Sequence, residues 1–414
     1  MSVDALVVLM GDEVAGTLVR LADRRLRFDY DSAYRESPDA TPLSLSMPTQ
    51  IPTHRDGVVT PWLWGLLPDN DAVLSRWARE FQVSSADPFG LLATPIGEDC
   101  PGTVRFCRPD KVDAALARPG DVAWLTDDEV GQRLRDLRRD TTAWLGTGFT
   151  GQFSLAGAQA KTALLFEAGR WGVPSGGTPT SHILKPAIEG LDDHDLNEHL
   201  CLRAAALSGL AVASSRVMRF ADQSAVVIER YDRYRRDGRL VRIHQEDLVQ
   251  ALAQHPSLKY QRDGGPGPEQ IVRLFHLTMP PRSAAAATEA FVDGLAWNWI
   301  IAGTDAHAKN YSLLLQGRDV ALAPFYDVAS ALPYAPDPLD LHLAMKLGGE
   351  YRLKAHRARS WMSTARELGL DPHQVCARVR ELAERAPDAF HEAAAAPDVA
   401  GLGSDLPARL LDAV

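Results

Sequence analysis

The order of strand-like and helix-like segments constrains the fold of this chain more than any other feature. Between residues 122 and 233, a charged helical segment and a glycine-rich loop precede strand-like TALLFE and SHILKP, and one helical segment precedes two more strand-like runs. Short apolar runs bounded by turn residues are typical of a sheet. After Arg233 the pattern becomes mainly helical. The sequence therefore predicts an α+β protein with a β-rich lobe followed by a helical lobe.

The residues before this region form a further β-containing segment. Residues 5–30 hold Val- and Leu-rich runs separated by Gly11-Asp12, which is the pattern of a hairpin. A polar stretch with a proline, 108–121, marks its end. We expect three parts, which are an N-terminal subdomain at 1–110, a β-rich N-lobe at 122–233 and a helical C-lobe at 234–414.

Charge and composition exclude several classes of protein. The net charge of −10 opposes approach to nucleic-acid phosphates, so direct DNA binding is not expected. The four cysteines lack paired spacing and read as reduced thiols. The first residues lack the basic start of a signal peptide, and the apolar stretch 295–303 is too short to cross a bilayer. We expect a cytoplasmic protein without membrane association.

Residues 303–312, GTDAHAKNYS, are the most informative for function. Asp305 and Asn310 have the D-x-x-x-x-N spacing of a protein-kinase catalytic loop, where the Asp accepts the proton of the substrate hydroxyl and the Asn binds magnesium. Asp327 ends a later apolar strand, where the magnesium-binding aspartate of a DFG-type motif is expected. Each acid alone could cap a turn, but their order across a short hairpin favours phosphoryl transfer. The sequence thus predicts a two-lobed protein-kinase-like fold that uses ATP and Mg²⁺.

Lysines in the β-rich lobe could hold the ATP phosphates. Lys185 in SHILKP lies on a predicted strand, and Glu198 on the next helix could pair with it. The glycine-rich loop before Lys161 could bring backbone N–H groups close to phosphates, although it lacks the Gly-Lys-Ser/Thr arrangement of a Walker A loop. Solvent-facing lysines and a flexible linker remain the alternatives at this stage.

Several blocks together resemble the HipA kinase family, in the order found in that family and over nearly the whole chain. They are PLSLSMP (42–48), WGLLPDN (64–70), SLAGAQAKTALL (154–165), SHILKP (181–186), ERYDR (229–233), HQEDLVQAL (244–252), KYQRDGGP (259–266), TDAHAKNYSLL (304–314) and APFYDV (323–328). Each block alone is modestly specific, but chance does not readily produce all of them in register.

The resemblance implies roles for the matching residues. Asp305 would be the catalytic base, and Asn310 and Asp327 the magnesium ligands. Ser154 matches the family's autophosphorylated serine, whose added charge would repel the ATP polyphosphate and expel the phosphate loop. Contacts with ATP are implied for Ala156, Gly157, Ala158, Gln159, Lys161, Lys185, Glu229, Arg230, Tyr231, Gln245, His307, Lys309, Asn310, Tyr326 and Asp327.

The resemblance also implies partners. These are a small HipB-like helix-turn-helix antitoxin, which would carry most of the DNA contact, and an aminoacyl-tRNA synthetase substrate, typically the glutamyl enzyme. Phosphorylation of the synthetase would arrest translation and growth. The chain departs from the family at Gly303, where Asn is frequent, and it lacks the arginine of the HRD motif, as expected for this family.

Two other readings remain open. A lipid or small-molecule kinase is possible because D-x-H-x-x-N also resembles phosphoinositide-kinase loops, and the basic cluster at 352–359 could face anionic lipid. The chain could also be an antitoxin-bound corepressor with little kinase activity. A metal hydrolase is set aside because the histidines lack HxxxH or HExxH spacing.

Overall fold

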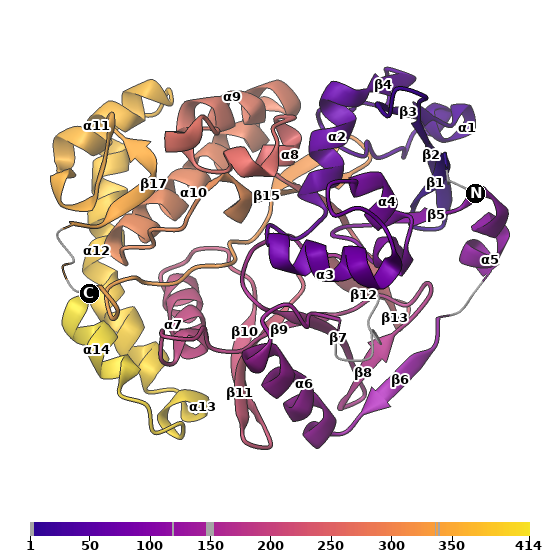
Figure 1. The fold of residues 1–414 in the computed structure, drawn as a ribbon. Helices are drawn as coiled ribbons and strands as arrows, with labels where there is room; N and C mark the ends of the chain where they lie inside the picture. The colour runs from indigo at the N-terminus through magenta and orange to yellow at the C-terminus, as the bar shows by residue number, and fades with distance from the viewer. Residues whose placement is uncertain (1–3, 118–119, 146–152, 336, 338–339) are drawn as a thin grey trace.

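The computed structural model describes residues 4–117, 120–145, 153–335, 337 and 340–414, and it has three main parts (Figure 1). The first is a five-stranded antiparallel sheet in the order β4-β3-β2-β1-β5. Its strands are β1 (Ala5–Met10), β2 (Glu13–Arg20), β3 (Leu26–Tyr30), β4 (Thr53–Arg55) and β5 (Val104–Cys107). The helices of this part are α1 (Ser32–Glu36), α2 (Asp56–Gly65), α3 (Asp71–Phe81), α4 (Pro88–Leu92) and α5 (Val112–Ala117).

The second part is a six-stranded sheet in the order β10-β11-β9-β7-β8-β6. Its strands are β6 (Val122–Leu125), β7 (Thr162–Glu167), β8 (Arg170–Pro174), β9 (His182–Lys185), β10 (Ser215–Phe220) and β11 (Gln223–Glu229). Two helices belong to it, α6 (Asp127–Arg139) and α7 (His194–Leu207). A capping box formed by Thr126 and Glu129 fixes the start of α6. The strand and helix order predicted for this lobe is confirmed.

The helical part predicted after Arg233 begins only after a further run of strands. The chain first forms the hairpin β12 (Arg233–Arg236) and β13 (Arg239–Arg242), followed by β14 (His244–Asp247). The hairpin turns at Asp237 and Gly238, which both have positive φ (50° and 76°), as a two-residue turn between twisted strands requires. Strand β14 then pairs with the hairpin β15 (Ser312–Gln316) and β16 (Asp319–Leu322), so residues far apart in sequence share one small sheet.

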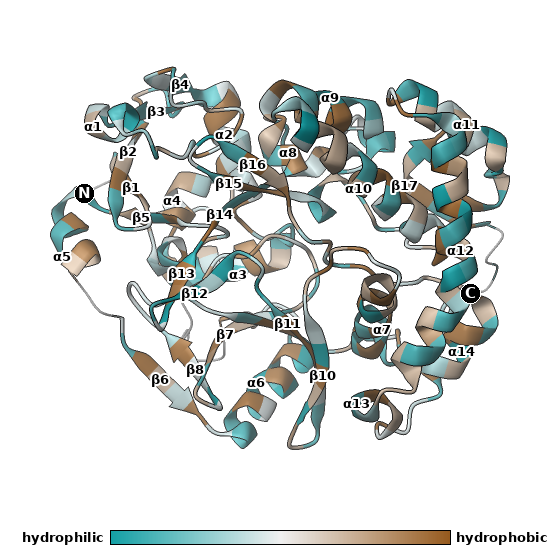
Figure 2. Ribbon diagram, turned by 180° about the vertical axis from the view of Figure 1, so that it is seen from behind, coloured by the Kyte–Doolittle hydropathy of each residue, from teal (hydrophilic) through white to brown (hydrophobic). Residues whose placement is uncertain are grey.

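The third part is helical. It contains α8 (Leu248–Ala251), α9 (Pro268–Thr278), α10 (Pro281–Ile300), α11 (Ala358–Glu367), α12 (Pro372–Ala394), α13 (Pro397–Ala400) and α14 (Leu406–Ala413), with the hairpin β17 (His342–Leu347) and β18 (Glu350–Arg352). In the described part of the chain, no helix is both long and apolar enough to span a bilayer. The termini lie on opposite sides of the molecule (Figures 1 and 2).

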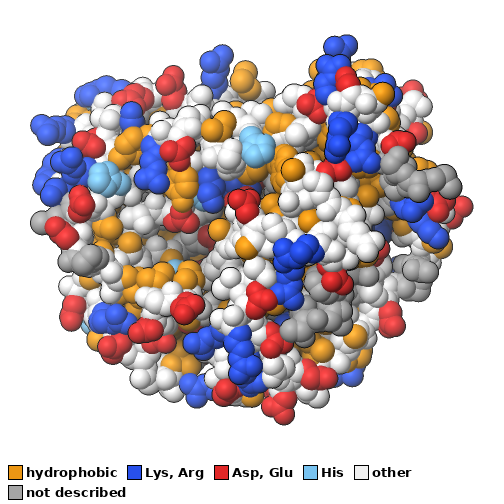
Figure 3. All heavy atoms as spheres, viewed as in Figure 1, with side chains coloured by type: hydrophobic (Ala, Val, Ile, Leu, Met, Phe, Trp, Pro, Cys, Tyr) orange, Lys and Arg blue, Asp and Glu red, His pale blue; other side chains and the backbone are white. Residues whose placement is uncertain are grey.

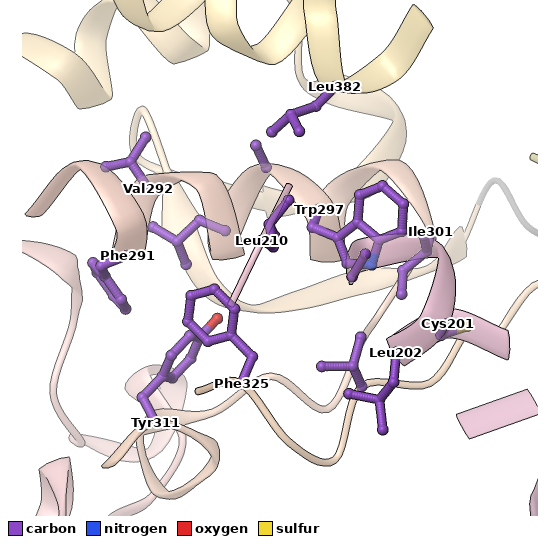
Figure 4. Packing of buried hydrophobic residues seen from close by; sticks show 14 of the residues in the cluster. Cys201, Leu202, Leu210, Phe291, Val292, Trp297, Ile301, Tyr311, Phe325 and Leu382 are labelled. Atoms are coloured by element: carbon purple, nitrogen blue, oxygen red, sulfur yellow. The ribbon is translucent and has the colours of Figure 1, made fainter. Parts of the chain in front are cut away.

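Helix α10 is the centre of the hydrophobic core of the helical part, and this core anchors the loops that carry the predicted catalytic residues. Phe291 of α10 packs edge-to-face on Tyr311, which in turn packs on Phe325, with ring centroids 5.0 and 5.8 Å apart (Figure 4). Tyr311 directly follows Asn310, and Phe325 lies two residues before Asp327. Because buried aromatic side chains fit only closely packed sites, these two anchors fix the backbone next to both polar residues.

The N-terminal sheet and the six-stranded sheet share one continuous hydrophobic cluster. Leu6 and Val8 of β1 belong to the same cluster as Leu164 of β7 and Val227 of β11. The apolar side of each sheet therefore faces the interior, and hydrophilic and hydrophobic segments alternate along the outer helices in Figure 2. The space-filling view of one face shows Lys, Arg, Asp and Glu side chains interspersed (Figure 3).

Candidate active site

Two adjoining cavities lie between the six-stranded sheet and the helical part. Their volumes are about 1260 and 110 Å³, and both are lined by Gly157, Lys161, His307, Asn310 and Asp327. The larger cavity also contains the predicted residues Ala158, Gln159 and Asp305. The smaller cavity also contains the predicted residues Ala156, Lys185, Glu229, Arg230, Tyr231, Gln245, Lys309 and Tyr326. The structure thus brings every predicted cofactor residue and Asp305 to one continuous site, and among the predicted site residues that the structure describes Ser154 alone is not a lining residue.

Lys185, at the end of β9, pairs with two predicted acids of the cleft, Glu198 and Asp327. Its Nζ lies 2.8 Å from Glu198 Oε1 and also contacts Asp327 Oδ1. Burial alone would lower the pKa of Lys185, but Asp327 and Glu198 raise it above its ordinary value, so this lysine stays protonated. Burial alone would likewise raise the pKa of Asp327, yet Lys185 and Lys161 hold it well below its ordinary value. The cleft therefore holds an ionised carboxylate beside a fixed cation.

Asp327 reaches this position through an unusual backbone conformation. Its φ is +53°, in the left-handed region that few residues other than Gly, Asn and Asp adopt. The preceding residues are pinned because the amide of Ala213 donates to Phe325 O at 2.8 Å. Tyr326 is also fixed, with its hydroxyl donating to Lys309 O at 2.8 Å. A residue in this conformation that is held by the anchored residues before it is typical of a functional site.

The catalytic-loop residues are held by bonds within the loop. Asn310 Nδ2 donates to Asp305 O at 2.8 Å, which leaves Oδ1 as the oxygen of that amide for another ligand. His307 N also donates to Asp305 O, at 2.7 Å. The Asp305 side chain itself is 71% exposed, with His307 Nε2 4.0 Å from its Oδ1. Burial lowers the pKa of His307 to about 4, so this imidazole is neutral near pH 7.

Gly303 braces the catalytic loop against α10. Its amide donates to Asn298 O at 2.7 Å, and a Cβ at residue 303 would lie 2.2 Å from Asn298 Oδ1. Asn298 Nδ2 in turn donates to Gly294 O at 2.9 Å. Any side chain at residue 303 would displace Asn298, so glycine suits this packing. The departure from the family pattern therefore goes with a close contact between the loop and the helix.

The described part of the predicted phosphate loop lies over the cleft. Lys161 Nζ donates to Ala156 O at 2.7 Å and lies 5.1 Å from the ring centre of Trp144. Gly157 has φ +100°, and a Cβ there would lie 2.6 Å from Lys161 Nζ, so only glycine lets the loop close over this lysine. Burial lowers the pKa of Lys161 to about 8, with Asp327 acting in the opposite direction. The predicted loop glycines Gly146, Gly148 and Gly151 lie outside the described residues.

An N-terminal segment, residues 66–70, holds both the phosphate loop and the catalytic loop. Asp69 N donates to Gly157 O at 3.1 Å, and Asn70 Nδ2 donates to Ala158 O at 3.3 Å. Asp69 Oδ1 accepts from Lys309 Nζ at 2.8 Å. Burial would raise the pKa of Asp69, but Lys309 and a second lysine lower it. Sequence reasoning assigned no role to Asp69, although it lies within the WGLLPDN block.

Aromatic residues form one wall of the smaller cavity. The rings of Tyr231 and Tyr326 stack with centroids 5.5 Å apart, and the Tyr231 hydroxyl donates to Gln245 Oε1 at 2.6 Å. The amides of Glu229 and Arg230 donate to Ser214 O and Ser181 O, both at 2.9 Å. The segment that joins the sheet to the helical part is therefore fixed by backbone hydrogen bonds.

The Arg230 side chain belongs to a buried ion cluster that lies behind this wall. The cluster joins three arginines to two aspartates, which are Arg230, Arg233, Arg242, Asp99 and Asp232. Asp232 Oδ2 also accepts from the amide of Gly102 at 2.8 Å. Asp99 and Gly102 come from the N-terminal part, so the cluster ties that part to the cleft. No sequence spacing indicated this arrangement.

Ser154 is fully buried beneath the phosphate loop. Its hydroxyl donates to Leu66 O, and its amide donates to Asp99 O at 2.8 Å. The predicted modification site is thus packed against the N-terminal part in this conformation, and a kinase could reach its hydroxyl only after residues 153–155 move.

The donor set of the cleft fits magnesium. Asn310 and Asp327 line both cavities and supply an amide and a carboxylate oxygen. Within the described ranges, no cluster of three or more His, Cys, Asp or Glu side chains could form a complete metal cage. Mg²⁺ in phosphotransfer sites is held by one or two protein ligands together with phosphate oxygens and water, so this sparse set is appropriate.

Family models cover most of the chain. Residues 6–107 match the HipA N-terminal domain, and residues 153–390 match the HipA-like C-terminal domain. The chain belongs to the HipA family. The predicted kinase-like α+β fold is also confirmed, because a solved HipA structure from Shewanella oneidensis, a toxin–antitoxin complex with HipB and operator DNA, superposes with a TM-score of 0.83. That match has 25% identity and covers 98% of this chain and 96% of the other.

Curated relatives of this HipA-family chain are named as kinases. It is 33% identical over 393 residues to Y4mE of Sinorhizobium fredii, named as a kinase, and the match covers 94% of this chain and 91% of the relative. It is 28% identical over 363 residues to the serine/threonine-protein kinase toxin HipA of Shewanella oneidensis, covering 85% and 80%.

Proposed function

We propose that this chain is an ATP-dependent serine/threonine protein kinase and the toxin of a toxin–antitoxin pair. The observation that supports this most is the convergence of Asp305, Asn310 and Asp327 with the Lys185–Glu198 pair where two cavities join. A base, two oxygen ligands for a metal and a paired lysine are the parts that protein kinases use for phosphoryl transfer.

The adenine ring would occupy the smaller cavity beside Tyr231. Because the amides of Glu229 and Arg230 already donate within the fold, the ring would take its backbone donor from Tyr231. The phosphates would extend past Lys161 and Lys185 toward Asp327. Two cations within a partly dry cleft stabilise a polyphosphate more strongly than they would in water.

The transfer step would join the oxygen of a substrate Ser or Thr hydroxyl to the γ-phosphorus and break the bond to the β–γ bridging oxygen. Asp305 would orient that hydroxyl and accept its proton. Lys185 would stay charged through its pairing with Glu198 and bind the phosphates of ATP. Bound to Asn310 and Asp327, Mg²⁺ would neutralise charge on the phosphate oxygens.

Autophosphorylation of Ser154 would switch the kinase off. The serine is fully buried against Leu66, and a phosphate of charge about −2 has no space there. The modified loop would therefore leave its place over Lys161 and take the phosphate-binding groups away from the cleft.

The partners follow from the family. The solved relative is a complex of HipA with HipB and operator DNA. We infer a HipB-like helix-turn-helix antitoxin for this chain, with DNA contacted mainly through that partner, since a net charge of −10 disfavours direct binding. An aminoacyl-tRNA synthetase, such as the glutamyl enzyme, is the proposed substrate, and its phosphorylation would halt translation.

The decisive experiment incubates the purified chain with γ-labelled ATP and magnesium, alone and with purified aminoacyl-tRNA synthetases, followed by mass spectrometry. Asp305→Ala and Asp327→Ala are each expected to abolish transfer, whereas Asp319→Ala, an exposed acid on the hairpin between them, should not. Ser154→Ala should stay active and lose self-inactivation. ATP binding without any label on protein would instead favour an antitoxin-bound corepressor or a kinase with a non-protein acceptor.

A further inference from the structure

The substrate side of Asp305 is occupied by a tyrosine of the same chain. The Tyr260 hydroxyl donates to Asp305 Oδ1. In a kinase catalytic loop this carboxylate receives the proton of the acceptor hydroxyl. The phenol of Tyr260 therefore stands where the hydroxyl of an acceptor must bind. Burial and the contact with Asp305 raise the pKa of Tyr260, so the phenol remains a neutral donor near pH 7.

The fold holds Tyr260 in this place. Its carbonyl accepts from the amides of Asp263 and Gly265, both at 3.0 Å. Its ring packs edge-to-face on His307 with centroids 4.8 Å apart, and the amide of Ala308 donates to Lys259 O at 3.2 Å. These contacts do not involve the hydroxyl. The ring would stay against the catalytic loop even without its hydrogen bond to Asp305.

Asp305 does not depend on Tyr260 for the position of its backbone. Asn310 Nδ2 and His307 N both donate to Asp305 O, at 2.8 and 2.7 Å. The Asp305 side chain is 71% exposed even with Tyr260 in place. The phenol thus occupies Oδ1 of this carboxylate, while the rest of the side chain stays open to solvent.

A third cavity opens on the other side of Tyr260. It has a volume of about 310 Å³ and is lined by Tyr260, Arg262, Thr304, Asp305 and residues 340–344 before and within β17. Asp305 lines both this cavity and the large cavity of the nucleotide cleft. A side chain entering along β17 would therefore reach Asp305 through a cavity other than the one that is lined by Lys161 and Asp327. The lining combines the guanidinium of Arg262, the carboxylate of Asp305 and the apolar side chains of Leu343 and Ala344. This mixture of charged and apolar groups suits a peptide segment.

We propose that Tyr260 is a gate on the acceptor side of Asp305, and that the cavity beside β17 is the acceptor subsite. The gate opens when the Ser or Thr hydroxyl of an acceptor peptide displaces the phenol from Asp305. The proposal rests on the kinase function proposed above. While closed, the gate slows ATP hydrolysis that uses Oδ1 of Asp305 as the base. In that reaction the water oxygen bonds to the γ-phosphorus, the bond to the β–γ bridging oxygen breaks and the water proton passes to Asp305.

The test compares Tyr260→Phe with Tyr234→Phe, which alters a partly exposed tyrosine on the hairpin β12–β13. Initial rates of phosphate release from labelled ATP and magnesium are measured without acceptor. Protein-bound label is measured separately with a mixture of purified aminoacyl-tRNA synthetases. Tyr260→Phe keeps the ring contact with His307 and removes one hydrogen bond to a charged group, so phosphate release should rise by about tenfold. Tyr234→Phe should match the wild type.

The ratio of released phosphate to protein-bound phosphate separates a gate from a merely structural residue. A gate mutant shifts that ratio toward release, whereas a destabilised chain loses both activities together. Unchanged or lower phosphate release in Tyr260→Phe overturns the proposal. If the wild type transfers label, the kinase function stands whatever Tyr260→Phe does. If neither protein consumes ATP, both the kinase function and the gate are refuted.

Discussion

Replacing Asp69 by Asn should loosen the catalytic loop, although the residue lies in the N-terminal part of the chain. Asp69 Oδ1 and Oδ2 lie 2.8 and 3.3 Å from Lys309 Nζ and Lys259 Nζ. The Lys309 side chain is only 2% exposed and that of Asp69 10%, so the pair is poorly screened by water. The substitution keeps the size of the side chain and the hydrogen bond from the backbone amide of residue 69 to Gly157 O. It leaves the Lys309 ammonium with weaker partners.

The expected magnitude follows from what remains around Lys309. Removing one partner of a buried ion pair costs about 3–5 kcal/mol of stability. Lys309 keeps a second partner, because Asp247 Oδ2 lies 3.8 Å from its Nζ. The loss in the free energy of unfolding should therefore be near or somewhat below the lower end of that range, about 2–3 kcal/mol. The KM for ATP should rise, because Lys309 lies on the same short helical turn as Asn310, whose side-chain amide is the proposed magnesium ligand.

Thermal melting and initial-rate kinetics at several ATP concentrations provide the assay. Asp71→Asn is the matched control, since Asp71 is exposed in the first turn of α3 and its interaction with the helix terminus contributes at most about 1 kcal/mol. A melting temperature and a KM for ATP equal to those of Asp71→Asn would refute the reasoning. A double substitution with Lys309→Met should recover part of the lost stability, because it removes the uncompensated buried charge.

Three further predictions concern single side chains. Burial lowers the pKa of Lys161 to about 8, so the charge of this side chain is lost as pH rises through that value. The KM for ATP should therefore increase from pH 7 to pH 9, and this increase should be smaller in Lys161→Arg. Burial raises the pKa of Glu246 from 4.5 to about 8, so its stabilising contribution is complete below pH 4.5 and is lost as pH rises through 8. In thermal melts between pH 4.5 and pH 8, the melting temperature of Glu246→Gln should therefore rise relative to that of the wild type. Gly303→Ala should lower the melting temperature and kcat, with a loss of about 1–3 kcal/mol from the clash with Asn298, and a melt equal to that of Gly57→Ala, whose added Cβ meets nothing within 4 Å, would contradict this.

The local signals in the sequence were enough to predict which residues lie together in the cleft. The spacing of Asp305 and Asn310, and the position of Asp327 after an apolar strand, depend on short segments that fold in the same way in many kinases. Lys185 and Glu198 could be paired because a strand followed directly by a helix places them near each other, and they lie 2.8 Å apart. Their roles in catalysis stay predictions until the variants are measured.

Contacts between distant segments could not be predicted. Asp69 and Lys309 are separated by 240 positions, and no periodic pattern relates them. The hairpin at Asp237-Gly238 was missed because its strands are rich in arginine and read as a polar surface rather than as β-structure. Its turn dipeptide was nevertheless a strong hairpin signal. The gate residue Tyr260 showed no catalytic signature in sequence, since its importance comes from its approach to Asp305 in space.

The buried ion cluster has a consequence for how this protein can evolve. Asp99 comes from the N-terminal part, while its partners Arg230, Arg233 and Arg242 follow the six-stranded sheet. A chimaera that joined the first 110 residues of one relative to the remainder of another would retain these ion pairs only if both parents carried the same charged residues at these positions. Otherwise it would leave an arginine unpaired in a dry interior, at a cost of about 3–5 kcal/mol. Recombination should therefore transmit the N-terminal part and the cleft together, as one inherited unit.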